Sequence, residues 1–425
     1  MLALLLIVLS TAAHAHAEFR AASVKVDITP TTPQWLMGYG ARQSTAIHDP
    51  IFHRIAILDD GKTQVIVVAS DLCVFSPGVF DETVAELKLD PKQLWWTVTH
   101  THSAPEVGPP GVYDVLLKGR SEHAWSREYL AFTKAKLAEG IAAARAKLAP
   151  ARMVTGVGRA NANINRRARD LDGSISLGYN PDGPVDRQIG LVRLEDAGTG
   201  KIIALIANYA MHGTALGGQW MEISGDAPSA AINYVEQQLG ATVLYVNGAA
   251  GNIAPIYTTQ ANPRAAHLPQ FRVLLGEKIL AANATLGGAT APAALRLSEK
   301  IVETPRRADI GWPAELGQYA AKSPAGADLI RIPVRMLAIG DTVLWGAPVE
   351  LFCEISMRVR EDSPFRHTFF FGYMNGWLGY LPTAAAFAEG GYEPRTSPFT
   401  PAVERHFTEG VSNAIAGLRE STGRN

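Results

Sequence analysis

The chain is poor in cysteine and in clustered charge, and each shortage removes a class of protein. Only two cysteines, Cys73 and Cys353, occur among 425 residues, with no CxxC pair, so no structural zinc site of the Cys/His type is expected. The two are either a disulfide or two buried thiols. Lysine and arginine are scattered and the net charge is −1. We therefore expect no nucleic-acid partner and no role on an acidic membrane surface.

Long apolar segments are also lacking, apart from one at the N-terminus. Residues 1–13 have the length of a signal peptide, and Ala15-His16-Ala17 has the A-x-A form of a cleavage site. We expect residues 1–17 to be removed before Glu18, although the segment begins without Lys or Arg. The alternative is an uncleaved membrane anchor, but the run is shorter than the ~20 residues that a bilayer span needs. The mature protein is thus predicted to have no transmembrane span and to be secreted or periplasmic.

What the chain does contain is a large apolar fraction, 47% of all residues, with no low-complexity linker. Apolar strands alternate with helical segments, as in Val65–Asp71, Asp81–Leu89 and Leu94–Val98. Such a β-α-β order is typical of α/β proteins, in which functional groups follow the carboxyl ends of buried strands. We predict an α/β fold with mixed sheets flanked by helices, forming a single large catalytic domain over residues 18–425.

Two of these buried strands run into histidines. The segment Leu94–Thr99 leads to His100 and His102, and Ile202–Met211 leads to His212. Residues i and i+2 of a strand share a face, so His100 and His102 are expected to point the same way. Imidazoles delivered together suit a metal or a proton-transfer partner, or they simply bond to their neighbours. The repeated pattern favours one shared site.

Three further positions carry candidate chemistry, each with an ordinary alternative. The polar run Asn161–Asp170 contains Arg166, which either binds an oxyanion or lies in a solvated loop. Asp226 precedes the predicted helix Pro228–Leu239, where capping is its usual role and catalysis the alternative. Glu350 is predicted to begin a helix that ends at Arg360, where a carboxylate complements the helix dipole.

Taken in order, these motifs resemble the neutral (non-lysosomal) ceramidase family over nearly the whole mature chain. The segments that carry the resemblance are Val24–Pro30, Thr99–Pro105, Asn163–Arg166, His212–Thr214, Ser224–Asp226, Ala250–Pro255, Gly346–Glu350, Gly379–Tyr380 and Gly391–Glu393.

The resemblance implies one Zn²⁺ per chain and hydrolysis of an N-acyl amide, such as that of a ceramide-like lipid, by metal-activated water. It implies that the zinc ligands are His100, His212, Glu350 and Tyr380. It also implies that His102 and Arg166 face the substrate carbonyl, that Tyr380 stabilises the reacting group, and that Asp226 orients a ligand. The resemblance further implies that Asn252 and Tyr392 bind the substrate, a small molecule or lipid.

The chain departs from the family at several points. Ala254 stands where the family has a catalytic serine, so a covalent serine mechanism is not available there. Trp377 replaces a smaller or tyrosyl residue and is expected to narrow the acyl channel. Only residues 393–425 follow Tyr392, too few for the family's C-terminal β-sandwich. Two alternatives stay open: hydrolysis of another ester, amide or sugar-linked substrate, and a non-catalytic binding protein. The oligomeric state is open as well.

Overall fold

One eight-stranded sheet forms the centre of the computed structural model, which describes residues 18–120, 122–257, 267–292 and 294–420. The strand order is β14-β12-β11-β8-β1-β5-β6-β7. The strands are β1 (Arg20–Asp27), β5 (Phe52–Asp59), β6 (Gln64–Ser70), β7 (Leu94–Val98), β8 (Ala149–Arg159), β11 (Gln188–Asp196), β12 (Ile202–Tyr209) and β14 (Thr242–Asn247). Neighbours are antiparallel except β6–β7 and β12–β14. The predicted α/β class with mixed sheets is confirmed.

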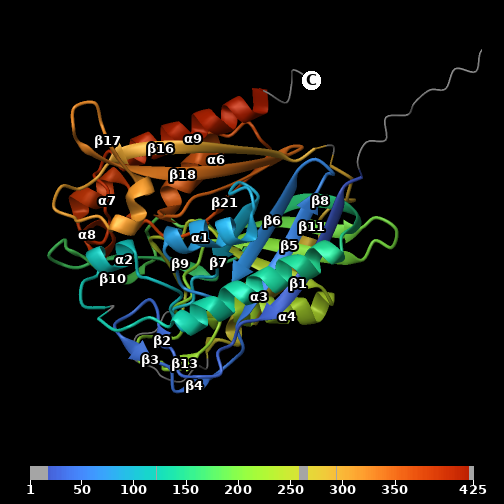
Figure 1. Ribbon diagram of the computed structural model, residues 1–425, viewed down its shortest axis with the longest axis horizontal. Coiled ribbons are helices and arrows are strands. Elements are labelled where there is room, and N and C mark those ends of the chain that lie inside the picture. The colour runs from blue at the N-terminus through green and yellow to red at the C-terminus, as the bar shows by residue number, and fades with distance from the viewer. Residues whose placement is uncertain (1–17, 121, 258–266, 293, 421–425) are drawn as a thin grey trace, which may run out of the picture.

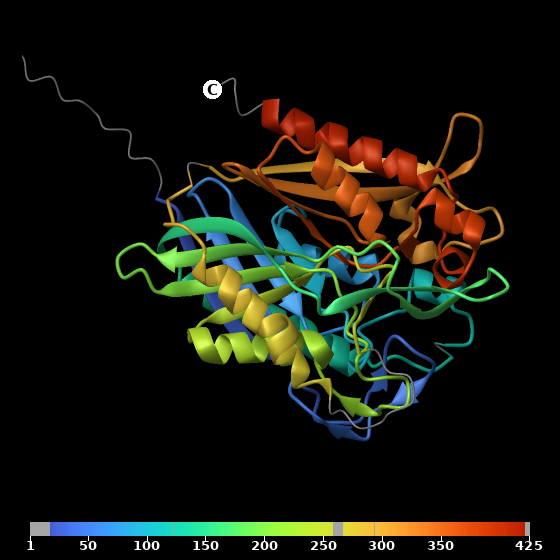
Figure 2. The ribbon, with the colours of Figure 1, turned by 180° about the vertical axis from the view of Figure 1, so that it is seen from behind.

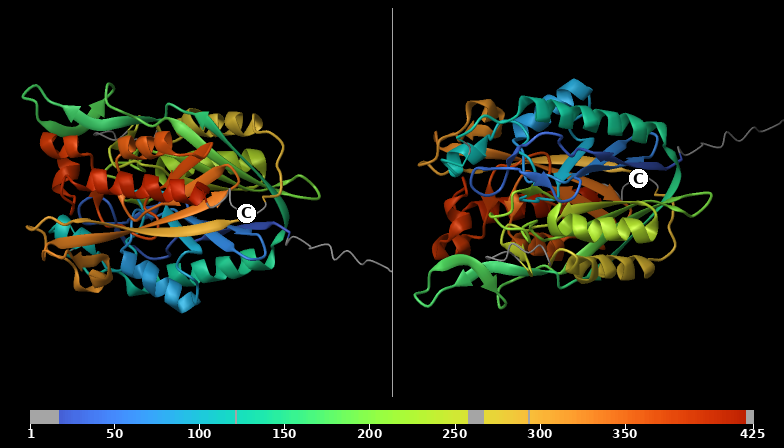
Figure 3. Two further views of the ribbon diagram at one scale, coloured as in Figure 1. Left: turned by 90° about the horizontal axis from the view of Figure 1, so that it is seen from above. Right: turned by 90° about the horizontal axis from the view of Figure 1, so that it is seen from below.

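The sheet folds over on itself, so that its two halves face each other. Strand β14 contacts β5, β6 and β7, and apolar side chains of both halves, such as Trp95 and Leu244, share one buried cluster. Helix α3 (Arg127–Ala146) covers β1 and β5, while α4 (Asp226–Leu239) and α5 (Glu277–Ala284) cover the other half. Figure 3 shows the resulting layers, with helices outside and two layers of strands between them. This closure brings the ends of β7 and β12 together.

A second sheet lies beside the first, in the order β16-β18-β19-β21 with β17 paired to β18. Its strands are β16 (Arg296–Pro305), β17 (Ala320–Lys322), β18 (Asp328–Ile339), β19 (Thr342–Gly346) and β21 (His367–Phe371). Helix α9 (Val403–Glu420) packs along β16 and against α6 (Cys353–Asp362), as Figures 1 and 2 show. The segments after β19 and β21 reach the edge where β7 and β12 end.

Short elements fill the space between the sheets and this edge. The helices are α1 (Pro77–Leu87), α2 (Val112–Leu116), α7 (Ala384–Glu389) and α8 (Tyr392–Arg395), with a π-helical turn at Arg272–Gly276 and a 3₁₀ turn at Ala314–Tyr319. The strands are β2 (Trp35–Leu36), β3 (Arg42–Gln43), β4 (Ala46–Ile47), β9 (Asn163–Arg169), β10 (Ile175–Asn180), β13 (Glu222–Ile223), β15 (Ile253–Pro255), β20 (Glu350–Leu351) and β22 (Tyr380–Leu381).

Two local predictions were wrong. Glu350 does not begin a helix: it lies in β20, which pairs with β22, and the helix starts at Cys353. Asp226 is not the cap residue of its helix, because α4 begins at Asp226 itself, with Gly225 before it.

Three other expectations concern the membrane and the cysteines. The signal peptide at residues 1–17 lies outside the described residues. In the described part of the chain, no helix is both long and apolar enough to cross a membrane. Both cysteines are buried and free, so the disulfide alternative is not realised.

Candidate metal centre

His100 is delivered to the centre by a sharp turn at the end of β7. The extended strand stops at Val98, and His100 itself has φ of 61°, in the left-handed region that few non-glycine residues adopt. Its Nδ1 lies 2.9 Å from the carbonyl oxygen of Cys73, and the Tyr373 ring stacks on the imidazole at 4.1 Å. Because Nδ1–H donates to this carbonyl, the Nε2 lone pair points the other way, into the centre.

His212 is presented in the same manner by the loop after β12. Its Nδ1 lies 2.9 Å from the carbonyl oxygen of Ile253, which again leaves Nε2 free to face the centre. The loop is joined to the His100 loop by a backbone bridge between Thr101 and Gly213. A Cβ at Gly213 would lie 2.7 Å from the Thr101 Cα, so only glycine allows this approach. The two histidine loops are thus fixed to each other.

Glu350 comes from the second sheet and completes the cluster. It pairs in register with Tyr380 in the parallel β20–β22 ladder, and its amide donates to the carbonyl of Gly379 at 3.0 Å. Its Oε1 lies 3.2 Å from His100 Nε2 and 2.9 Å from His212 Nε2, and all three residues are buried. Three ligand atoms from distant parts of the chain therefore meet at one point.

These three atoms fit a metal ion. Zn–N and Zn–O bonds of about 2.0–2.1 Å in a tetrahedral site place ligand atoms about 3.3 Å apart, close to the separations found here. Glu350 Oε1 is buried and has no hydrogen-bond donor in proper geometry. With both Nδ1 atoms bound to carbonyls, lone pairs face one another, an arrangement that requires a positive charge between them. His100, His212 and Glu350 would hold the ion.

The electrostatics of the group agree with a cation site. Burial raises the pKa of Glu350, but the charge on His100 lowers it well below its usual range. Burial lowers the pKa of His100, yet Cys73 and Glu350 raise it to about 10. Burial and Arg166 lower the pKa of His212 to about 3, so this imidazole is neutral and able to ligate. The shifts at Glu350 and His100 both favour positive charge at this point.

Arg166 lies at the rim of the same cluster, held by β9 and α8. Its Nη1 lies 2.9 Å from His212 Nε2, and its Nη2 donates to the Tyr380 hydroxyl at 3.1 Å. Its Nε donates to Glu393 at 2.9 Å. The predicted alternative of a solvated loop is wrong for this residue, because Arg166 is buried. A bound metal would take the lone pair of His212 that Arg166 now occupies.

His102 also lies in the cluster. Its Nε2 is 3.2 Å from His100 Nε2, so the two imidazoles do converge, although the left-handed turn at His100 and not a continued strand brings them together. Burial lowers the pKa of His102 well below its usual range, so the ring is neutral. His102 can therefore accept a proton or donate a hydrogen bond to a group in the centre.

Two further predicted site residues, Asp226 and Asn252, are hydrogen-bonded to other parts of the protein. The carboxylate of Asp226 accepts the backbone amides of Ala215 and Leu216 at 2.9 Å, so it holds the loop after His212 rather than an imidazole. The Asn252 side chain donates to Glu354 at 2.8 Å and accepts the Cys353 amide at 3.1 Å. Its amide is therefore occupied by the protein.

Tyr392 is closer to the centre. Its ring packs against that of Tyr380 with centroids 5.7 Å apart.

Two contacts of the centre carried no signal in the sequence. The indole of Trp377 donates to Glu350 Oε2 at 2.8 Å, and the Cys73 carbonyl accepts the His100 Nδ1–H. In each of these two pairs the residues are 27 positions apart in the chain, a separation that fits no helix or strand periodicity. The Arg166 partner Glu393 is 227 positions away, although it directly follows Tyr392 in the predicted motif.

Comparisons with known proteins found a matching family model and related structures. A family model described as neutral/alkaline non-lysosomal ceramidase, N-terminal, matches residues 19–262. The neutral ceramidase of Pseudomonas aeruginosa is 24% identical over 515 aligned residues, which cover 99% of this chain and 75% of that protein. Its crystal structure superimposes with a TM-score of 0.76 at 19% identity, over 95% of this chain and 75% of that one. A ceramidase complexed with C2 gives the same TM-score and identity, over 95% and 76%. The solved structures share the fold of this chain.

Proposed function

Since the chain belongs to the neutral/alkaline non-lysosomal ceramidase family, we propose that it is an exported zinc-dependent hydrolase of an N-acyl amide bond, as in a ceramide-like lipid. The name of the P. aeruginosa relative points to ceramide as that protein's substrate. Glu350 Oε1 lies within 3.2 Å of both His100 Nε2 and His212 Nε2, and this is the observation that supports the proposal. When bound there, zinc would activate a water and polarise the amide carbonyl.

The chain's own residues would supply the rest of the chemistry. Arg166 is buried and carries its charge at every working pH, and it would donate N–H groups to the developing oxyanion. The neutral His102 would accept the proton that the attacking water loses, or donate to the same oxygen. Tyr380, next to Arg166, would be the fourth metal ligand and would contact the reacting group. One well-placed oxyanion donor contributes on the order of 3 kcal/mol.

Ala254 keeps a second function in view, that of a binding protein with the same fold. The residue is buried in β15, paired with Ile164 of β9, and it offers no nucleophile. An activated water needs no side-chain nucleophile, and the buried candidate ligand atoms of His100 and His212 lie within 3.2 Å of Glu350 Oε1, as a metal centre would require. We therefore favour hydrolysis and treat binding alone as the alternative.

The proposal is tested first by metal content. We expect about one zinc per chain in the purified protein by mass spectrometry, and loss of that zinc in His100→Ala and His212→Ala. His48→Ala, at an exposed histidine paired with Asp49 outside the centre, is the control and should keep the metal. A folded wild type that binds no zinc, even after zinc is added, overturns the proposal.

Activity then separates the remaining alternatives. A panel of N-acyl amides, including ceramides, and of esters and glycosides is offered to the wild type and to His100→Ala. Hydrolysis of the amides by the wild type alone supports the proposal. Turnover only of another class, or zinc binding with ligand binding and no turnover, supports the alternatives. Export is checked separately, since the mature N-terminus should begin at Glu18.

A further inference from the structure

The indole of Trp377 is buried beside the candidate metal centre, and the proposed chemistry does not yet use it. Trp377 is 3% exposed, and its Nε1–H donates to Glu350 Oε2 at 2.8 Å. The other oxygen, Oε1, is the one that faces His100 and His212. Because a carboxylate rotates easily about its last torsion, a donor fixed on one oxygen determines where the other points. The indole therefore selects the oxygen that reaches the centre.

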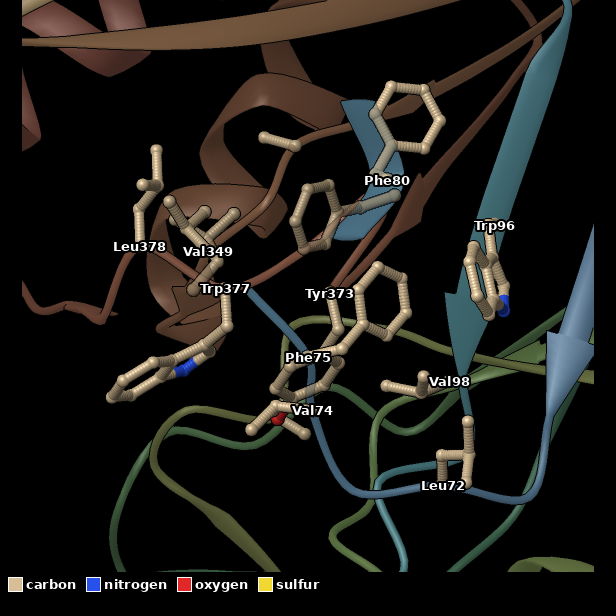
Figure 4. Close-up of a cluster of buried hydrophobic side chains, with 14 of the residues drawn as sticks. Leu72, Val74, Phe75, Phe80, Trp96, Val98, Val349, Tyr373, Trp377 and Leu378 are labelled. Atoms are coloured by element: carbon tan, nitrogen blue, oxygen red, sulfur yellow. The ribbon is translucent and has the colours of Figure 1, made fainter. Parts of the chain in front are cut away.

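The ring itself is held by its neighbours, so the donor is well placed. It packs against Tyr380 with centroids 6.3 Å apart and an interplanar angle of 87°, and against Tyr113 with centroids 5.8 Å apart. Figure 4 shows Trp377 at the edge of the hydrophobic cluster, with Val74 and Phe75 beside it. A ring fixed on both sides loses little further freedom when it donates to Glu350.

The Trp377 ring also lines a cavity. Together with Met37, Val74 and Phe75 it lines a small cavity of about 20 Å³. This volume holds a single water at most. The indole thus lines this cavity and also donates to Glu350, so a smaller side chain at this position would enlarge the cavity beside the centre.

We propose that Trp377 is a positioning residue for Glu350 and, at the same time, the residue that limits how far the apolar part of a substrate extends beside the centre. The proposal rests on the proposed function above. Removing a group that hydrogen-bonds to a metal ligand and orients it typically weakens metal binding by about 10- to 100-fold. Trp377 meets that description, because it bonds the oxygen of Glu350 that does not face the histidines.

The positioning role is tested by Trp377→Phe, which removes the N–H and keeps most of the ring. Trp95→Phe is the matched control: Trp95 is 0% exposed, and its indole donates to the Lys92 carbonyl at 3.0 Å, in β7 and away from the centre. Zinc affinity is measured by competition with a chelator, and the stability of each metal-free variant is measured by thermal unfolding. We expect both variants to be destabilised, but only Trp377→Phe to bind zinc about 10- to 100-fold more weakly.

Unchanged zinc affinity in Trp377→Phe, or an equal loss in Trp95→Phe, would overturn the positioning role. A wild type that binds no zinc would overturn the proposed function instead, so the two failures are distinct. A kinetic split adds a second measure. Because Trp377 acts through Glu350, kcat should fall for a short N-acyl substrate while KM stays nearly constant.

The size limit is tested with Trp377→Leu and a series of N-acyl substrates of increasing chain length. We expect kcat/KM for the longest chains to rise about 10-fold relative to the shortest, because one or two methylenes in an apolar pocket are worth that much. A chain-length profile identical to that of the wild type would contradict this part. Trp377→Phe gives the same test at smaller amplitude if the leucine variant does not fold.

Discussion

At the scale of single residues, the shape of the centre depends on a glycine that contributes no chemistry. Gly38 has φ of 104°, and a Cβ there would lie 2.4 Å from Cγ of the His102 ring. Backbone and imidazole can only be this close because the side chain is absent. The position of the His102 ring therefore depends on Gly38 as well as on the end of strand β7.

We predict that Gly38→Ala displaces His102 and leaves the three candidate metal ligands in place. Hydrolysis should fall by about 10²- to 10³-fold, the effect of losing one transition-state donor, while zinc content stays near one per chain. Gly40→Ala is the control, since nothing lies within 4 Å of a Cβ at that position. Steady-state kinetics and metal analysis of both variants check this. Full activity in Gly38→Ala would show that His102 takes no part in turnover.

The residues that form the site were easier to predict from the sequence than the contacts between them. The histidines follow apolar strands, so their place could be predicted from local pattern, and His100, His102 and His212 do meet. The hydrogen bond between Trp377 and Glu350 could not be predicted in this way, because it depends on β20 and the turn before β22 folding back onto each other. Such a contact leaves no periodic trace.

At the scale of elements, a buried ionic network ties strand β9 to helix α8. Glu393 is fully buried, and its carboxylate bonds Arg166 Nε at 2.9 Å and Arg167 Nη1 at 2.8 Å. Arg167 also reaches Glu389 at the exposed side. Since Tyr392 precedes Glu393 in α8, the network fixes both Arg166 and the tyrosine beside the centre.

We predict that Glu393→Gln lowers the free energy of unfolding by about 3–5 kcal/mol, because it leaves the buried Arg166 without a counter-charge and leaves Arg167 only the partly exposed Glu389. Glu389→Gln, at a carboxylate 38% exposed, should cost less than about 1 kcal/mol. Urea unfolding of both variants measures the difference. Similar losses in the two would mean that burial of Glu393 adds nothing to the strength of its ion pairs.

The same elements show why local patterns misled. The run Asn161–Asp170 has three arginines and reads as solvated, yet β9 buries two of them, because their partner lies 227 and 226 positions further on. Glu350 has the local signature of a helix start, but pairing with Tyr380 holds it in a strand. In both cases a contact between distant segments outweighed the local preference.

At the scale of the whole molecule, stability should depend on one buried histidine outside the centre. His53 of β5 is 0% exposed and lies 2.6 Å from the Ser70 hydroxyl and 3.1 Å from the Thr133 carbonyl. Burial lowers its pKa from 6.5 to about 4. The unfolded chain therefore binds this proton more tightly, and the stabilisation present above pH 6.5 is lost as the pH falls toward and through 4.

We predict a loss of about 2–3 kcal/mol from this group between pH 7.5 and 4.5. His53→Gln should be less stable than the wild type at pH 7.5 but should lose less on acidification. Chemical unfolding of both proteins at the two pH values measures how much the free energy of unfolding of each changes with pH. Contributions from all other groups cancel when the two changes are subtracted. Parallel pH profiles would contradict the assignment to His53.

The class of the whole fold was predictable, whereas its closure was not. Apolar strands alternating with helices indicated a mixed α/β protein, which is confirmed. The folding of one eight-stranded sheet onto itself depends on which strands become neighbours, such as β1 between β5 and β8. Strand periodicity carries no information about that order.

The backbone bridge between Thr101 and Gly213 also bears on when the centre comes into existence. His100 follows the edge strand β7, His212 follows β12 near the opposite edge, and Glu350 belongs to another sheet, so no short stretch of chain holds two of the three ligand atoms. An unfolded or partly synthesised chain thus cannot capture the ion at this site. If the centre binds zinc as proposed, the ion would act on the folded molecule: it would add stability in proportion to the logarithm of free zinc, and folding could be followed without it.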